Sequence, residues 1–190
     1  TKKDCWDFCG GIWSVTKKEQ IKNHVTMTSK PQKKQPTFSL ARHDEPMEEL
    51  VKGTDKKTLA VWAIDCAQRV LPYFEEKYPI DPRPRNALTT LRAWIQTGVF
   101  HMAEIRGASL ASHAAAREAG EDSPARSAAR AAGQAVATAH VLTHSLGAAI
   151  YAQQAIWRTA DPADADTAVT GERDWQYRHL LALREKTGSE

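Results

Sequence analysis

The sequence predicts an all-α protein, an up-and-down bundle of about five helices with an irregular N-terminal extension. From residue 58 onward, apolar residues recur every three or four positions, which is the spacing of one face of a helix. No stretch there alternates polar and apolar residues as a strand does. A capping side chain precedes proline at Asp81-Pro82 and at Ser123-Pro124, a pattern typical of helix starts.

Five helices are expected in order along this part of the chain. They span roughly residues 56–77, 81–96, 100–119 and 124–159, and a last segment after Asp161-Pro162 that is firmest over 173–186. Gly98 and Gly120 are expected to end the second and third helices. The fourth is long, rich in alanine and apolar on both sides, so it should run through the middle of the bundle.

The charge divides the 190 residues into two predicted regions. Residues 1–57 form a Lys-rich, partly flexible extension with 12 basic and 8 acidic residues, and residues 58–190 form the helical domain with 14 and 15. The net charge of +3 therefore resides in the extension. Its segment Lys30–Pro36 lacks the aromatic residues that accompany basic ones in nucleic-acid sites, so no nucleic-acid partner is expected. We also expect residues 1–26, which precede Met27, to be an upstream or vector-derived addition.

Other classes are disfavoured by composition. No apolar run approaches the roughly 18 residues of a membrane span, so no membrane partner is expected. Three cysteines make no disulfide framework, which favours a cytoplasmic location. Cys66 falls on the apolar stripe of the first helix, where an inert core thiol is expected. No serine elbow or phosphate-binding loop occurs, so no catalytic residue is assigned.

Two histidines offer the sharpest candidate for chemistry. His140 and His144 are four residues apart, so on one helix they point the same way and suit zinc or another divalent transition metal. His113, Asp65 or Cys66 would be the third ligand. Val141 stands where a zinc hydrolase needs its glutamate. The alternative is a pair of neutral histidines packed among alanines.

Other polar residues flank the predicted core stripes. Asp65 and Arg69, four apart on the first helix, are expected to pair with each other, and with the two histidines they make up a polar core constellation. Arg83 and Arg85 begin the second helix, where they either tie a loop to a carboxylate or grip acidic groups of a partner.

A third set lies on one edge of the third helix, where Arg106, His113 and Arg117 recur at helical spacing. These side chains are candidates for a partner-binding surface.

Several ordered blocks resemble a family of small bacterial helical proteins. The blocks are Ala63–Pro72, Asp81–Arg85, Ser112–Arg117 and Ala128–His140 with His144. The family is classed as immunity proteins of bacterial polymorphic-toxin systems, of the immunity-protein-5-like group. The resemblance covers about residues 58–157.

The resemblance implies a cytoplasmic, non-catalytic protein that binds a cognate toxin domain and neutralises it. Its candidate contacts are then Arg83, Arg85, Arg106, His113 and Arg117, with no cofactor, and a homodimer is left open. The alternative from a different class is a metal-binding helical protein or enzyme centred on His113, His140 and His144.

Overall fold

The structure is a computed structural model that describes residue 38 and residues 44–187. Every regular element in this part of the chain is a helix, so the predicted all-α fold is confirmed. The helices are α1 (Glu45–Lys52), α2 (Lys56–Val70), α3 (Pro72–Glu75), α4 (Arg83–Thr97), α5 (Met102–Glu118), α6 (Pro124–Ala137), α7 (His144–Thr159) and α8 (Ala165–Thr187). None of these helices is long and apolar enough to cross a membrane.

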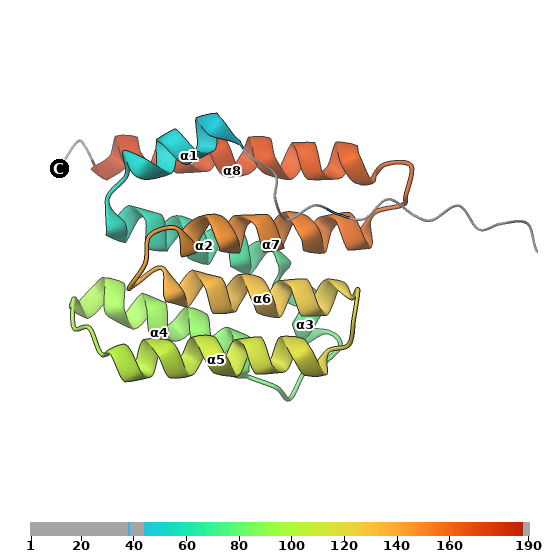
Figure 1. Cartoon of the computed structure of the whole chain (residues 1–190), viewed down its shortest axis with the longest axis horizontal. Helices are drawn as coiled ribbons and strands as arrows, with labels where there is room; N and C mark the ends of the chain where they lie inside the picture. Colours follow the sequence, from blue (N-terminus) through green and yellow to red (C-terminus); the bar gives the residue numbers. More distant parts are fainter. Residues whose placement is uncertain (1–37, 39–43, 188–190) are drawn as a thin grey trace, which may run out of the picture. The chain divides into compact units, whose positions relative to one another are not determined.

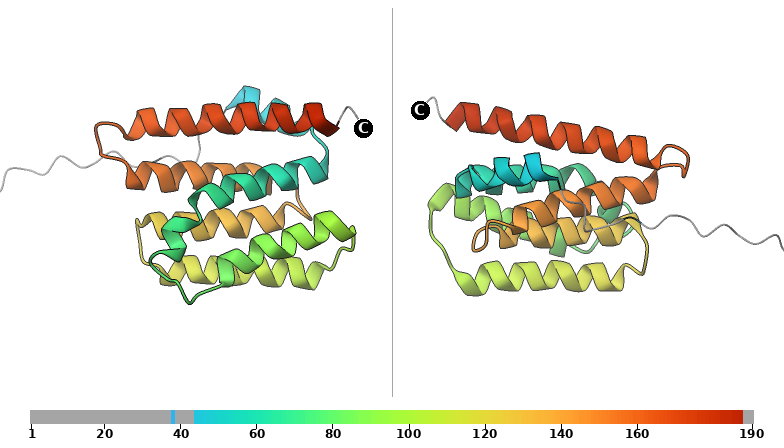
Figure 2. Two further views of the ribbon diagram at one scale, coloured as in Figure 1. Left: turned by 180° about the vertical axis from the view of Figure 1, so that it is seen from behind. Right: turned by 45° about the horizontal axis from the view of Figure 1, so that its top comes forward.

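The long helices α2 and α4 to α8 alternate in direction, which is the expected up-and-down arrangement (Figure 1). α5, α6 and α7 lie side by side in one layer, and α4 and α2 lie behind them, as the view from behind shows (Figure 2). α8 packs on α7 and α2, and α1 packs on α8. α6 contacts α2, α3, α4, α5 and α7, so it is the centre of the bundle.

The helix boundaries follow the local signals closely. Asp55 caps α2, because its side chain accepts hydrogen bonds from the backbone N–H groups of Lys57 (2.9 Å) and Thr58 (3.0 Å). The helix expected over 56–77 is divided by Pro72 into α2 and α3. Gly98 ends α4 in the left-handed conformation, with φ of +69°, as expected of a glycine at this position.

The prediction of a single long helix over residues 124–159 is wrong, because the chain forms two helices there. α6 ends at Ala137, and short backbone hydrogen bonds such as His140 N–H to Ala137 O (3.1 Å) carry the chain into a turn before α7. A continuous helix would measure about 54 Å, whereas the neighbouring α5 has 17 residues and about half that length. Folding back lets the apolar side of α7 pack on α6 instead of projecting beyond the bundle.

α1 is a helix that the sequence did not predict, within the stretch expected to be irregular. Asp44 caps it by accepting a hydrogen bond from the Met47 backbone N–H (3.3 Å), and Met47, Leu50 and Val51 are buried. Three buried apolar residues in so short a helix, alongside four charged ones, give a weak periodic signal. The division of the chain at residue 57 stays a prediction.

The core joins large side chains from α2 and α3 to small ones from α6. Trp62, Leu59 and Phe74 are fully enclosed. In α6, 10 of 14 residues are buried, and eight of these ten are alanine or glycine, which allows neighbouring backbones to come close. Hydroxyls of α5 consequently reach the α6 backbone: Ser112 donates to Ala129 O (2.7 Å) and Ser109 to Gly133 O (2.9 Å).

This close packing predicts a specific cost at Gly133. A Cβ added there would lie 2.8 Å from Cε1 and 2.9 Å from Nδ1 of His113, so Gly133→Ala should lower the free energy of unfolding by about 1–3 kcal/mol. Gly107 and Gly171 are matched controls, because no atom lies within 4 Å of a Cβ added there. Alanine at either should stabilise by about 0.5–1 kcal/mol. Denaturant unfolding measures all three, and equal effects would contradict the packing described.

Candidate functional site

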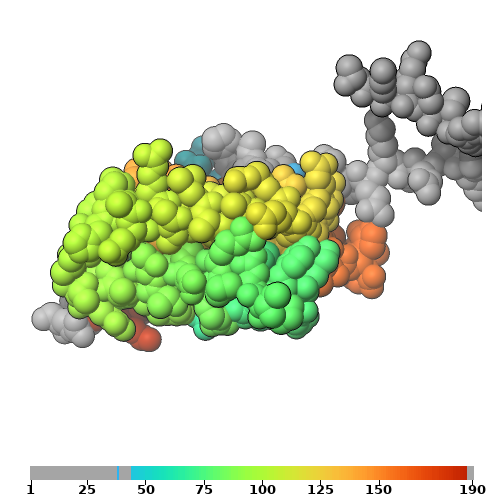
Figure 3. Space-filling view, turned by 90° about the horizontal axis from the view of Figure 1, so that it is seen from below, coloured from blue at the N-terminus to red at the C-terminus, as the bar shows by residue number. Residues whose placement is uncertain are grey.

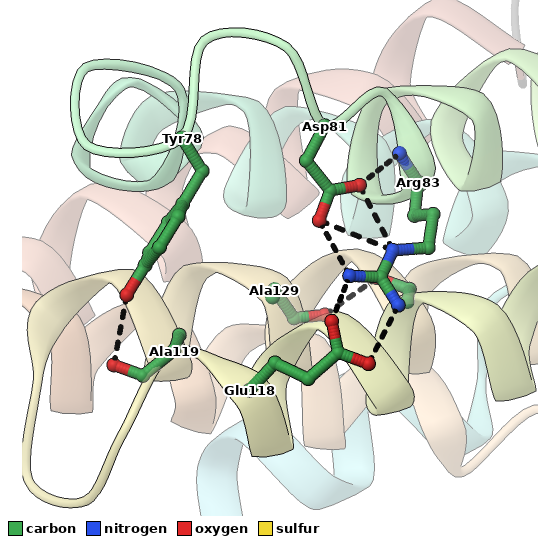
Figure 4. Close-up of polar contacts among 7 residues, drawn as sticks. Tyr78, Asp81, Arg83, Glu118, Ala119 and Ala129 are labelled. Atoms are coloured by element: carbon green, nitrogen blue, oxygen red, sulfur yellow. Dashed lines mark hydrogen bonds and ion pairs between the residues drawn. The ribbon is translucent and has the colours of Figure 1, made fainter.

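Arg83 is held within the protein by two carboxylates (Figure 4). Its Nε donates to Asp81 Oδ1 (2.9 Å), its Nη2 to Asp81 Oδ2 (2.7 Å), and its Nη1 to Glu118 Oε1 (3.0 Å). The pairing ties the start of α4 to the end of α5, and the hydrogen bonds from Arg83 lower the pKa of Asp81. Nearby, the Tyr78 hydroxyl donates to Ala119 O (3.2 Å).

Arg85 is also paired internally, donating from Nε and Nη2 to Glu75 at 2.5 and 2.6 Å. For both arginines the structure therefore shows the internal tie that was one of the two expectations. A guanidinium with a bidentate carboxylate offers fewer donors to a partner.

On the predicted edge of α5, two arginines differ from Arg83 and Arg85 in having no internal carboxylate partner among the described residues. Arg106 and Arg117 are exposed and make no ion pair or side-chain hydrogen bond with the described residues. α5 lies along the surface of the bundle for its whole length (Figure 3). These side chains are therefore available to a partner, unlike Arg83 and Arg85.

His113 belongs to the same helix but turns toward α6. Its ring lies against Gly133, and its Nδ1 is buried without a hydrogen-bond partner in the described part of the chain. Burial lowers the pKa of His113 to about 4, and the positive charges of Arg130 and Arg117 act in the same direction, as does His144. The ring is thus neutral near pH 7 and serves the packing of α5 on α6.

His140 and His144 lie at the turn between α6 and α7, with ring centroids 5.3 Å apart. Because a side-chain amide oxygen only accepts, Nδ1 of His144 donates to Gln134 Oε1 at 2.6 Å. Burial lowers the pKa of His144, and His140 lowers it further. Nδ1 of His140 is buried and has no partner among the described atoms.

Within residues 44–187, no group of three or more histidine, cysteine or acidic side chains is placed to hold a metal ion. His113, His140 and His144 therefore do not converge as the metal-binding alternative requires. His140 and His144 do not lie on one helix as expected, because α6 ends at Ala137 and α7 begins at His144.

Asp65 and Arg69 do not pair with each other, contrary to expectation, but each binds α8. Asp65 accepts from His179 Nε2 (2.7 Å), and Arg69 pairs with the buried Glu172 (3.0 Å). The Arg69 guanidinium lies 3.9 Å from the centroid of Trp175, which in turn stacks on His179. Where α2 crosses α8, His179 and Glu172 lie within hydrogen-bond distance of Asp65 and Arg69. These two pairs therefore stabilise the contact between the two helices.

Three arginines that sequence reasoning missed lie on α6 and α7. Arg126 and Arg130 are one turn apart on α6, and Arg158 lies near the end of α7. α6 and α7 contain no acidic residue, a signal that was present in the sequence. Burial lowers the pKa of Arg130; Tyr151 acts to raise it, and the positive charges of Arg126 and Arg117 lower it further.

Cys66, the free cysteine among the described residues, is fully buried, and burial raises the pKa of its thiol well above the usual value. A raised pKa keeps the thiol protonated and unreactive. The described residues thus form an all-α bundle that presents charged helical surfaces on a tightly packed scaffold.

Comparison with known families identifies the family to which this helical chain belongs. A family model described as Imm-5 like putative immunity protein matches residues 49–183. The chain belongs to this family, which confirms the resemblance found in the sequence. No curated protein and no solved structure matches the chain.

The neutral His113 predicts a pH dependence of stability. The folded pKa is about 4 and the ordinary value 6.5, so between these pH values the unfolded chain binds more protons than the folded one. Stability is therefore complete above about pH 6.5 and falls as the pH approaches 4. For a partly exposed ring the loss should be on the order of 1–2 kcal/mol.

Melting temperatures at pH 7 and pH 4.5 test this expectation. His113→Asn should show a smaller fall between the two pH values than the unsubstituted protein. His101→Asn, a change at an exposed histidine, should leave the fall unchanged. Equal falls in all three proteins would contradict the role of His113.

Proposed function

We propose that the protein is an immunity protein that binds a cognate bacterial toxin domain and neutralises it without catalysis. The match of the family model over residues 49–183 carries this proposal. An inhibitor of this kind needs a rigid scaffold and a complementary charged surface rather than a set of reacting groups. We place its action in the cytoplasm, where reduced thiols such as Cys66 are the rule.

Within this proposal the exposed arginines of α5 are the first candidates for contacts. Arg106 and Arg117 have donors available, and a guanidinium binds a carboxylate with two parallel hydrogen bonds. Arg83 and Arg85 contribute less because Asp81, Glu118 and Glu75 already occupy them. The His113 ring packs against Gly133 of α6 and so fixes the position of α5, the helix that carries Arg106 and Arg117.

Growth rescue tests the proposal. Each gene adjacent to this one is expressed in bacteria, alone and together with this protein. One product should arrest growth alone, and co-expression should restore growth and give a complex that copurifies. An unrelated helical bundle of similar size is the control and should restore nothing. Arrest that persists during co-expression, with no complex recovered, would reject the proposal.

A further inference from the structure

Four arginines of adjacent helices gather around the N-terminal half of α6. We call Arg117 of α5, Arg126 and Arg130 of α6, and Arg158 of α7 the arginine strip. Arg126 and Arg130 are one turn apart on α6, and Arg158 donates to Ser127 Oγ of the same helix (2.7 Å). The positive charges of Arg126 and Arg117 in turn disfavour the charged form of Arg130. α5, α6 and α7 form one layer, so the strip crosses three neighbouring helices (Figure 1).

The acidic groups around the strip do not balance it. Arg158 pairs with Asp122 (2.8 Å), and Arg126 lies 4.0 Å from Glu121, whose side chain is 90% exposed. Arg117 and Arg130 have no carboxylate partner among the described residues, and α6 and α7 contain no acidic residue. The strip is therefore a local excess of positive charge on a domain whose overall charge is close to neutral.

Arg130 makes this excess energetically unfavourable in the isolated protein. It is partly buried, and transfer of a charge out of water is costly unless an opposite charge compensates it. Burial disfavours its charged form, and no carboxylate among the described residues pairs with it to compensate. A partner that brings carboxylates to the strip would offset both the desolvation and the repulsion.

An apolar side chain lies on the same face of α5. Leu110 is 55% exposed and stands between Arg106 and Arg117, four residues after the first and seven before the second. These spacings place the three on one side of the helix. Arginine is enriched in protein–protein contacts, and Leu110 adds exposed apolar area beside Arg106 and Arg117.

We propose that the arginine strip, with Leu110 at its edge, is the docking surface for an acidic protein surface. The inference rests on the proposed function, because the partner that it specifies is the toxin domain, bound through its carboxylates. Such a contact speeds association by electrostatic steering and weakens as salt screens the charges.

The first test uses the toxin domain identified by growth rescue and the full-length protein. Arg117→Gln with Arg130→Gln removes the two strip arginines that lack a carboxylate partner. Arg178→Gln is the matched control, because Arg178 is exposed on α8 and, among the described residues, donates to the backbone carbonyl of Asp174 alone. The double variant should bind about tenfold more weakly or worse, mainly through slower association.

The control should bind within about twofold of the unsubstituted protein, and all three should melt cooperatively near the same temperature. Salt should weaken binding of the double variant less steeply than that of the control. Unchanged binding by the double variant, or an equal loss in the control, would overturn the proposal while leaving the immunity function intact.

The second test is independent of any toxin and uses a poly-L-glutamate peptide of about 20 residues as the acidic probe. The lysines of residues 1–57 are present in every variant, so the difference between variants reports the strip alone. The double variant should bind the peptide several-fold more weakly than the control. If no adjacent gene product is neutralised but this difference is found, the immunity function fails and the acidic docking surface stands.

Duplex DNA of equal length is the competing probe. Tighter binding to DNA than to poly-glutamate, lost in the double variant and kept in the control, would overturn the proposal in favour of a nucleic-acid ligand. Equal binding of poly-glutamate by both variants would also overturn it.

Discussion

The close approach of helices to α6 is the constraint on which the rest of the structure depends. Alanine and glycine line its buried sides, so hydroxyls of α5 reach its backbone carbonyls and the His113 ring rests directly on Gly133. On the other flank, a Cβ added at Gly147 of α7 would lie 2.8 Å from the side chain of Gln134. Larger residues on α6 would push both neighbouring helices outward.

The same constraint decides where charge appears on the surface. Because α6 is enclosed by five helices, ten of its 14 residues are buried, and Arg126 and Arg130 are among the four that stay partly exposed. The α2–α8 side differs, since its charges are matched in pairs such as Asp65 with His179 and Arg69 with Glu172. These matched pairs stabilise the α2–α8 contact, whereas Arg117 and Arg130 have no carboxylate partner among the described residues.

The sequence predicts the fold class and most helices because these depend on local signals: Asp55 and Ser123 as caps, Gly98 as a stop, and apolar residues at helical spacing. It does not predict the break after Ala137, since no glycine or proline stands there to mark the end of a helix. Pairings such as Asp65 with His179 depend on how α2 crosses α8, which periodicity does not encode.

The predictions for the histidines and the arginines differ in how well they agree with the structure, for the same reason. Spacing on one helix placed Arg106 and Arg117 correctly on a common exposed edge of α5. The same reasoning put His140 and His144 on one helix, whereas α7 begins only at His144 and the two rings meet at a turn, with centroids 5.3 Å apart. It also gave no sign that Arg83 would pair with Glu118 of another helix. Residue contacts within one helix follow from sequence, whereas contacts between helices require the packing.

Native-state hydrogen exchange tests the central role of α6 most directly. If α6 is the packing centre, the amides of residues 128–135 should exchange only through global unfolding, with a free energy equal to that from denaturant unfolding. The amides of the turn at residues 139–143 should exchange at much lower free energy. Exchange of α6 amides by local opening, at free energies below those of α2 and α7, would contradict the account.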